Sequence, residues 1–167
     1  MELLQKFLNT PDVPELGPGP RKGVQSEASL DEQLGPILSD SKLSKRGREL
    51  VRGTILLWHD HFEPAHEIAQ NIEDADGSYL HAILHRREPD YSNSKYRFRR
   101  VGKHPCFEAL ARESRSLFKQ NKDEWDPFAF VDACARVAGG SSGDSEVQTL
   151  RAVQALEFKL FLQHVAA

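Results

Sequence analysis

From residue 29 onward, apolar side chains recur at intervals of three and four residues, the spacing of one face of an α-helix. Leu30, Leu34 and Leu38 show this pattern, and no segment alternates apolar and polar residues as a half-buried β-strand would. Prolines such as Pro105 divide the pattern, because proline interrupts a helix interior but fits the first turn of a new helix. The sequence therefore predicts an all-α fold of about seven helices.

Several helix boundaries follow from local signals. Ser29 has the capping-box spacing to Glu32 and is expected to open a helix, and a largely buried helix is expected over residues 45–59. Pro64 predicts a break near His61, a helix over 64–72 and a turn over 73–77. Further helices are expected over 79–87 and 91–101, after Pro105, after Asp126, and over 146–165.

The N-terminal part of the chain has a different composition. Residues 10–28 contain four prolines and three glycines, which disfavour helix and strand alike. We expect an N-terminal arm or linker over residues 1–28, followed by a single all-α domain over residues 29–167.

Composition narrows the class of protein. No apolar run approaches the length of a membrane span, and the opening MELLQKFLNT has neither a basic segment nor a continuous apolar segment. Cys106 and Cys134 are the two cysteines and do not form a CxxC pair, so we expect reduced thiols in the core rather than a disulfide framework. These features predict a cytoplasmic protein with no membrane segment.

Five of the seven histidines lie between residues 59 and 85, and imidazole is the commonest protein ligand of transition metals. His81 and His85 are four residues apart and therefore share one helix face, although HAILH lacks the glutamate of the metalloprotease motif. Residues 50–105 match themselves when shifted by 29 residues, as two successive helical hairpins would. If the first helices of these hairpins lie side by side, His59 lies near His85. We predict His59, His81 and His85 as candidate metal ligands for zinc, iron or manganese, with His61, His66 and Glu63 as less favoured candidates. The alternative is that His59 and His61 are exposed turn residues, that His66 pairs with Glu63, and that His81 or His85 hydrogen-bonds a buried carbonyl group.

A basic segment follows the histidines. Between His81 and His104 there are seven Lys or Arg residues and two Asp or Glu residues, while the rest of the chain is acidic. A local positive field of this kind attracts a small anion or an acidic peptide, whereas the acidic remainder argues against broad nucleic-acid binding. The candidate ligand-binding residues are Tyr96, Asn93, Arg99 and Arg100. The alternative is a solvated helix face whose arginines pair with acids elsewhere.

Two resemblances appear in the same region. In the 29-residue shift, Phe62 matches Tyr91 and Ala65 matches Ser94, and Pro105 ends the second unit. Residues 50–105 in this respect resemble the helical hairpins of the tetratricopeptide and Sel1-like superfamily, although the tryptophan-leucine-glycine-tyrosine pattern of its first helix is missing. The stretches WHDHFEPAHEIAQ and DGSYLHAILHRREPDYSNSKYRFRRVGKHP also resemble a family of uncharacterised bacterial and fungal proteins, which implies a domain over most of the chain and no particular activity.

Two functions remain open from the sequence. The leading hypothesis is a non-catalytic binding or scaffold module whose polar groove, built from residues 59–100, takes an acidic peptide or small anion. The competing hypothesis is a metal-binding protein or metal-dependent enzyme that uses the histidines. The sequence does not decide whether the protein is an enzyme.

Overall fold

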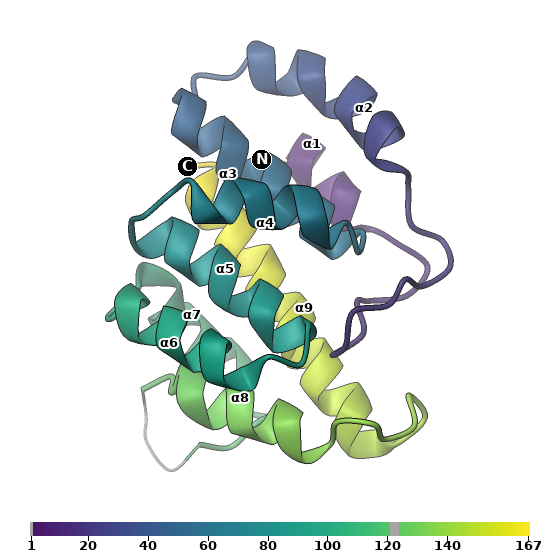
Figure 1. The fold of residues 1–167 in the computed structure, drawn as a ribbon, viewed down its shortest axis with the longest axis vertical. Helices are drawn as coiled ribbons and strands as arrows, with labels where there is room; N and C mark the ends of the chain where they lie inside the picture. The colour runs from purple at the N-terminus through teal and green to yellow at the C-terminus, as the bar shows by residue number, and fades with distance from the viewer. Residues whose placement is uncertain (1, 121–123) are drawn as a thin grey trace.

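The computed structural model describes residues 2–120 and 124–167, and in this part of the chain all regular structure is helical. It confirms the all-α prediction with nine α-helices and one 3₁₀ helix among the described residues, rather than about seven helices (Figure 1). The elements are α1 (Glu2–Gln5), η1 (Lys6–Leu8), α2 (Glu27–Ser39), α3 (Lys45–Trp58), α4 (Phe62–Gln70), α5 (Ala75–Arg87), α6 (Tyr91–Val101), α7 (Pro105–Ser114), α8 (Pro127–Arg136) and α9 (Ser145–Val165).

Helix starts agree with the predictions where a proline and a cap coincide. Pro105 and Pro127 each lie in the first turn of a helix, where the side chains of His104 and Asp126 accept backbone N–H bonds. At α2 the prediction was wrong, because the cap is Ser26, whose hydroxyl accepts from the N–H of Ser29.

The starts of α4 and α5 were also misplaced. Helix α4 begins at Phe62, so Pro64 lies within its first turn and does not precede a later start. Helix α5 begins at Ala75 because the side chain of Asp74 accepts from the N–H groups of Asp76 and Gly77. Most of the predicted turn over 73–77 is therefore the first turn of α5.

Helix α9 runs through the middle of the molecule and contacts α3, α7 and α8 (Figure 1). Its Phe158 packs edge to face against Trp58 of α3, with ring centroids 5.4 Å apart. Near its start, Leu150 and Val153 join Phe130 of α8 in a second apolar cluster. Because α9 packs against several helices, apolar residues cover more than one face of this helix.

Helices α3 to α6 position the candidate site. Helix α3 contacts α4 and α5, and α5 in turn contacts α4 and packs extensively against α6. Consecutive helices are thus neighbours, as in any series of short-looped hairpins. Membership of the tetratricopeptide-like superfamily remains a prediction.

The N-terminal arm is packed on the helices rather than detached from them (Figure 1). Leu4 and Phe7 belong to the main apolar core. Further along, Arg151 of α9 donates to the carbonyl oxygen of Val13 at 2.6 Å, and Arg87 of α5 donates to that of Glu15 at 3.1 Å. These bonds connect the arm to two helices that are distant from it in sequence.

Among the described residues, no helix combines the length and the apolar character that crossing a membrane requires. Cys106 and Cys134 are buried free thiols, as predicted, and burial raises the pKa of Cys106 to about 12 and that of Cys134 to about 11.

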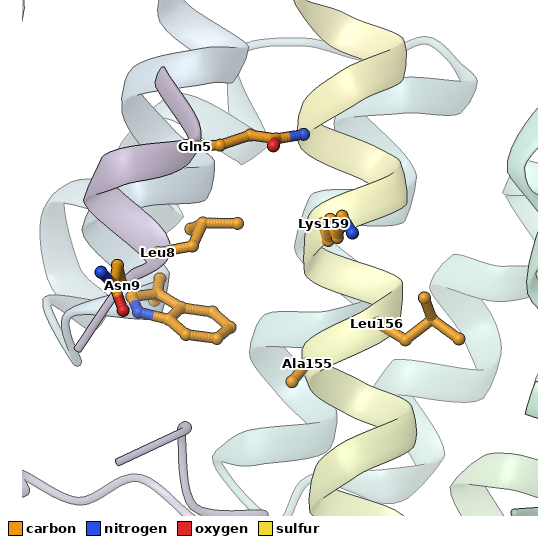
Figure 2. A pocket seen from close by; sticks show the side chains of 7 residues that line it. Gln5, Leu8, Asn9, Ala155, Leu156 and Lys159 are labelled. Atoms are coloured by element: carbon orange, nitrogen blue, oxygen red, sulfur yellow. The ribbon is translucent and has the colours of Figure 1, made fainter. Parts of the chain in front are cut away.

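A pocket of about 460 Å³ lies between the N-terminal helices and α9, and Figure 2 shows Gln5, Leu8, Leu156 and Lys159 around it. Its lining contains no carboxylate, histidine or cysteine, so it offers no evident chemistry.

Candidate metal centre

Three histidines from two neighbouring helices converge in what we call the three-histidine cluster: His66 of α4 and His81 and His85 of α5. One ring nitrogen from each residue lies within 4.8 Å of the others. The ring centroid of His66 is 4.6 Å from that of His81 and 5.6 Å from that of His85. The cluster forms because His81 and His85 occupy one face of α5, one turn apart, and that face meets α4.

The hydrogen bonds of the cluster leave ring nitrogens available. His85 Nδ1 lies 3.0 Å from the carboxylate oxygen Oε2 of Glu88, which can only accept, so Nδ1 carries the proton and donates. In the neutral ring Nε2 of His85 is then an unprotonated lone pair, and it is buried with no hydrogen-bond partner in the described structure. Both ring nitrogens of His81 are likewise buried without a partner there. Unsatisfied buried polar atoms each cost about 1–3 kcal/mol, so their concentration here indicates a site for a ligand.

Burial keeps two of these imidazoles neutral. It lowers the pKa of His81 to about 3, with the positive charge of Arg97 as the next cause. Burial also lowers the pKa of His85, although the nearby Glu88 carboxylate opposes this shift. Metal ions bind the neutral form of histidine, so at neutral pH these two rings need lose no proton to become ligands.

His66 connects the cluster to an acidic pocket on the surface. The pocket has a volume of about 490 Å³ and is lined by Glu27, Glu63, Pro64, His66, Glu67 and Gln70. Three carboxylates around the half-buried His66 make the local field attractive to cations. Glu63, a less favoured metal candidate, lies in this lining rather than among the grouped nitrogens.

His59 and His61, which the sequence placed among the metal candidates, bind the N-terminal arm. The Nδ1 atom of His59 accepts from the backbone N–H of Gln25 at 3.1 Å, so its Nε2 is protonated and donates to the carbonyl oxygen of Phe7 at 2.8 Å. Nε2 of His61 lies 2.7 Å from the carbonyl oxygen of Gln25. Both ring nitrogens of His59 are engaged in hydrogen bonds, so His59 has no nitrogen left for a metal. In the observed cluster His66, rather than His59, joins His81 and His85.

The predicted anion-binding residues lie on α6. Tyr96 is 45% exposed, Arg99 and Arg100 are exposed, and Asn93 is half-buried in the first turn. The basic segment as a whole is less open than its sequence suggested. Arg86 and Arg87 are fully buried: Arg86 pairs with Glu157 at 2.5 Å, and Arg87 pairs with Asp60 at 2.7 Å. Those two arginines therefore pair with acids elsewhere, as the alternative expected, but they are buried and do not lie on a solvated helix face.

A second group, Asp76, His104 and His164, we call the aspartate-histidine network. The Oδ1 atom of Asp76 accepts from Nε2 of His104 at 2.9 Å and from Nε2 of His164 at 2.8 Å. The Nδ1 atom of His104 accepts the backbone N–H of Cys106 at 3.2 Å, which requires the proton of a neutral His104 to be on Nε2. A metal on Nε2 would displace that proton to Nδ1, where it would face the N–H of Cys106. This network is therefore satisfied by hydrogen bonds, in contrast to the three-histidine cluster.

His66 is a less favoured candidate from the sequence, and Glu88 is not among the candidates. The reason is that His66 lies on a different predicted helix from His81 and His85, so no local spacing joins it to them. The spacing of His85 and Glu88, three residues apart on one helix, was a usable signal for a carboxylate that orients a ligand imidazole.

Comparison with protein-family profiles, with curated proteins and with solved structures finds no match for this chain. No relative therefore supplies a role for any of its residues. What the three-histidine cluster can bind has to be inferred from its geometry and its chemistry.

Proposed function

We propose that this protein binds a divalent transition-metal ion through His66, His81 and His85. The observation that carries the proposal is the convergence of three imidazoles from α4 and α5 with buried nitrogens that have no hydrogen-bond partner in the described structure. Glu88 supports it, because metal-binding histidines commonly donate their other ring N–H to a carboxylate, which fixes the ring and makes it more basic.

The ligand set favours zinc or iron over manganese, since imidazole suits the former and an oxygen-rich site the latter. Three ligands at 2.0–2.1 Å in tetrahedral geometry place their nitrogens roughly 3.3 Å apart. Binding therefore requires the ring nitrogens, which lie within 4.8 Å of one another, to approach, and the stacked rings of His81 and His85 to turn toward a common point. Three protein ligands leave one coordination position open. A metal of this kind can activate water or polarise a carbonyl group, which makes metal-dependent catalysis the natural extension of the proposal.

The sequence predicted a small anion in a polar groove built from residues 59–100, and the proposed metal site changes where this anion is expected. Because Arg86 and Arg87 bind Glu157 and Asp60, they do not line an open basic groove. An anion is accordingly proposed as a ligand near the metal, and an extended acidic peptide is no longer the favoured partner.

Elemental analysis of purified, untagged protein tests the proposal directly. After incubation with zinc and removal of excess metal, we expect about one zinc ion per chain, as the three-histidine set offers one site. His66→Asn and His81→Asn should each reduce the zinc content strongly. Because His66 is half-buried, its replacement keeps the test valid even if a variant at the buried His81 folds poorly.

The matched control is His164→Asn, which removes a half-buried histidine from the aspartate-histidine network. This variant should keep the zinc content of the unmodified protein. If the unmodified protein binds no zinc, iron or manganese and none of these metals raises its melting temperature, the proposal is wrong. Loss of zinc in His164→Asn with retention in His66→Asn would place the site in the other group.

A further inference from the structure

Solvent reaches the members of the three-histidine cluster unequally. His81 and His85 are 1% and 6% exposed, whereas His66 is half-buried. The ring of His66 meets both of them edge to face, with its centroid 4.6 Å from that of His81 and 5.6 Å from that of His85. Among the three, His66 is therefore the residue past which an ion from solvent can approach the buried rings.

His66 also lines the acidic pocket of about 490 Å³ on the surface. Helix α4 presents Glu63, His66, Glu67 and Gln70 to this pocket because residues three and four apart share one helix face. Glu27, the first residue of α2, also lines it. The lining contains no lysine or arginine, so its field attracts cations.

Two of these carboxylates are not neutralised. Glu27 pairs with Arg52 at 3.0 Å, whereas Glu63 and Glu67 are exposed and form no ion pair or side-chain hydrogen bond in the described structure. An acidic helix face by itself indicates only a solvated surface. This one adjoins buried imidazole nitrogens that have no hydrogen-bond partner among the described residues, which independently indicate a ligand.

The Glu88 side of the cluster is less suited to metal entry. There the Nδ1 atom of His85 donates to the Glu88 carboxylate at 3.0 Å, so this nitrogen carries the proton. The Nε2 atom of His85, which has the free lone pair, is buried. An ion that arrived beside Glu88 would meet an N–H group, whereas a metal binds an unprotonated nitrogen.

We propose that the acidic pocket is the entry site of the metal, where the carboxylates of Glu63 and Glu67 attract a hydrated divalent cation before it passes His66. This inference rests on the proposed metal site and concerns the route to it. It gives Glu63 a role in capture, whereas the sequence included Glu63 among the less favoured ligands. Charges at the mouth of a site raise the association rate of an oppositely charged ion, and salt weakens this effect.

Capture and coordination predict different kinetics. Because release follows the path of entry in reverse, carboxylates that stabilise the cation in the pocket speed both association and dissociation. Their removal should slow both steps and change the dissociation constant less than either rate. Removal of a carboxylate that coordinates the bound metal would instead speed dissociation.

Stopped-flow mixing of the metal-free protein with zinc measures association, with a fluorescent chelator reporting the free ion, and excess chelator measures dissociation. In the double variant Glu63→Gln/Glu67→Gln we expect the association rate constant at low salt to fall by roughly 10-fold, a value within the range of electrostatic steering. Raising the ionic strength to about 1 M, where the Debye length is about 3 Å, should bring the rates of the two proteins together.

The matched control is Glu108→Gln/Glu113→Gln, which removes two exposed carboxylates of α7, a helix that packs on α9. It lowers the net charge of the protein by the same amount and should leave both rate constants nearly unchanged. Glutamine is a good helix former, and circular dichroism checks that each variant is folded.

The outcomes separate the entry site from the metal site. Absence of zinc binding in the unmodified protein contradicts the proposed function itself. Zinc binding with an equal association rate in Glu63→Gln/Glu67→Gln, or with faster dissociation in that variant, overturns the entry site and leaves the metal site standing. Slower association in Glu88→Gln but not in the double variant would place the entry beside Glu88.

Discussion

The imidazole rings of His81 and His85 lie stacked, with centroids 4.6 Å apart and ring planes inclined by 21°. Two protonated rings would repel each other strongly at this distance in a buried interface, so the arrangement requires at least one neutral ring. The lowered pKa values of both residues agree with this requirement. Packing of α5 against α4 and α6 thus holds two imidazoles in the form that a metal binds.

Glu88 provides a test of how the cluster is oriented. In Glu88→Gln, the amide no longer holds the proton on Nδ1 of His85 through a charged hydrogen bond, and we expect zinc affinity to fall by roughly 10- to 100-fold. Chelator competition measures the change. Glu73→Gln, at another exposed carboxylate, is the control and should keep the original affinity. Equal affinities in all three proteins would show that Glu88 does not support the site.

The buried ion pair between Arg86 and Glu157 predicts a large effect on stability. Both side chains are fully buried, and the Glu157 carboxylate also accepts from the hydroxyl of Tyr79 at 3.1 Å. Glu157→Gln leaves the guanidinium without its counter-charge and should lower the free energy of unfolding by about 3–5 kcal/mol. Urea denaturation measures this quantity.

Tyr79→Phe is the companion variant for that ion pair. It removes one hydrogen bond while leaving both charges, so it should cost only about 1 kcal/mol. Similar losses in Tyr79→Phe and Glu157→Gln would mean that the charge of Glu157 contributes little.

Asp60 connects the arm to the helices. Its Oδ1 atom accepts from Arg21 and from Arg87, each at 2.7 Å, and its side chain is 1% exposed. Asp60 has a positive φ of 66°, a conformation that asparagine also tolerates, so Asp60→Asn changes the charge with little backbone strain. We expect a loss of about 3 kcal/mol in stability and faster tryptic cleavage after the exposed Lys22.

The control for this test is Asp12→Asn, at a carboxylate that is 60% exposed and pairs with the buried Arg151. Because Arg151 keeps its bonds to the carbonyl oxygens of Val13 and Pro14, this variant should change cleavage after Lys22 little. If both variants are cleaved at the rate of the unmodified protein, Asp60 does not hold the arm.

The aspartate-histidine network predicts a dependence of stability on pH. Hydrogen bonds from His104 and Arg46 hold the pKa of Asp76 well below its ordinary value, despite a burial that acts in the opposite direction. A lowered folded-state pKa stabilises the protein above the unfolded value of about 3.9, and this contribution is lost as pH falls below that value. Asp76→Asn should therefore reduce stability at pH 7 by about 1–3 kcal/mol.

Urea unfolding as a function of pH measures this contribution. The stability difference between Asp76→Asn and the unmodified protein should shrink as the solution is acidified below about pH 4. Asp132→Asn, at an exposed carboxylate paired with Lys95, should show a small difference at every pH. A difference for Asp76→Asn that stays constant with pH would exclude the charge of Asp76 as its cause.

Local sequence patterns predicted where the helices occur, but they placed only some of the helix starts at the correct residue. Pro105 and Pro127 marked two starts correctly, because a ring that fixes φ and lacks an N–H suits a first turn. Pro64 marked the break near His61 correctly, but the helix begins two residues earlier, because a proline at the third helical residue still lies within the first turn. Asp74 was placed in a turn although its carboxylate caps α5.

For the candidate site, the sequence by itself determined that His81 and His85 share a face, since helical geometry fixes residues four apart. Only the tertiary structure decided which other groups join them. His66 rather than His59 completes the cluster because α4 packs on α5, while the N-terminal arm occupies both nitrogens of His59. Arg86 of the basic segment is buried against Glu157, because α5 packs near α9, a helix that lies far from it in the chain.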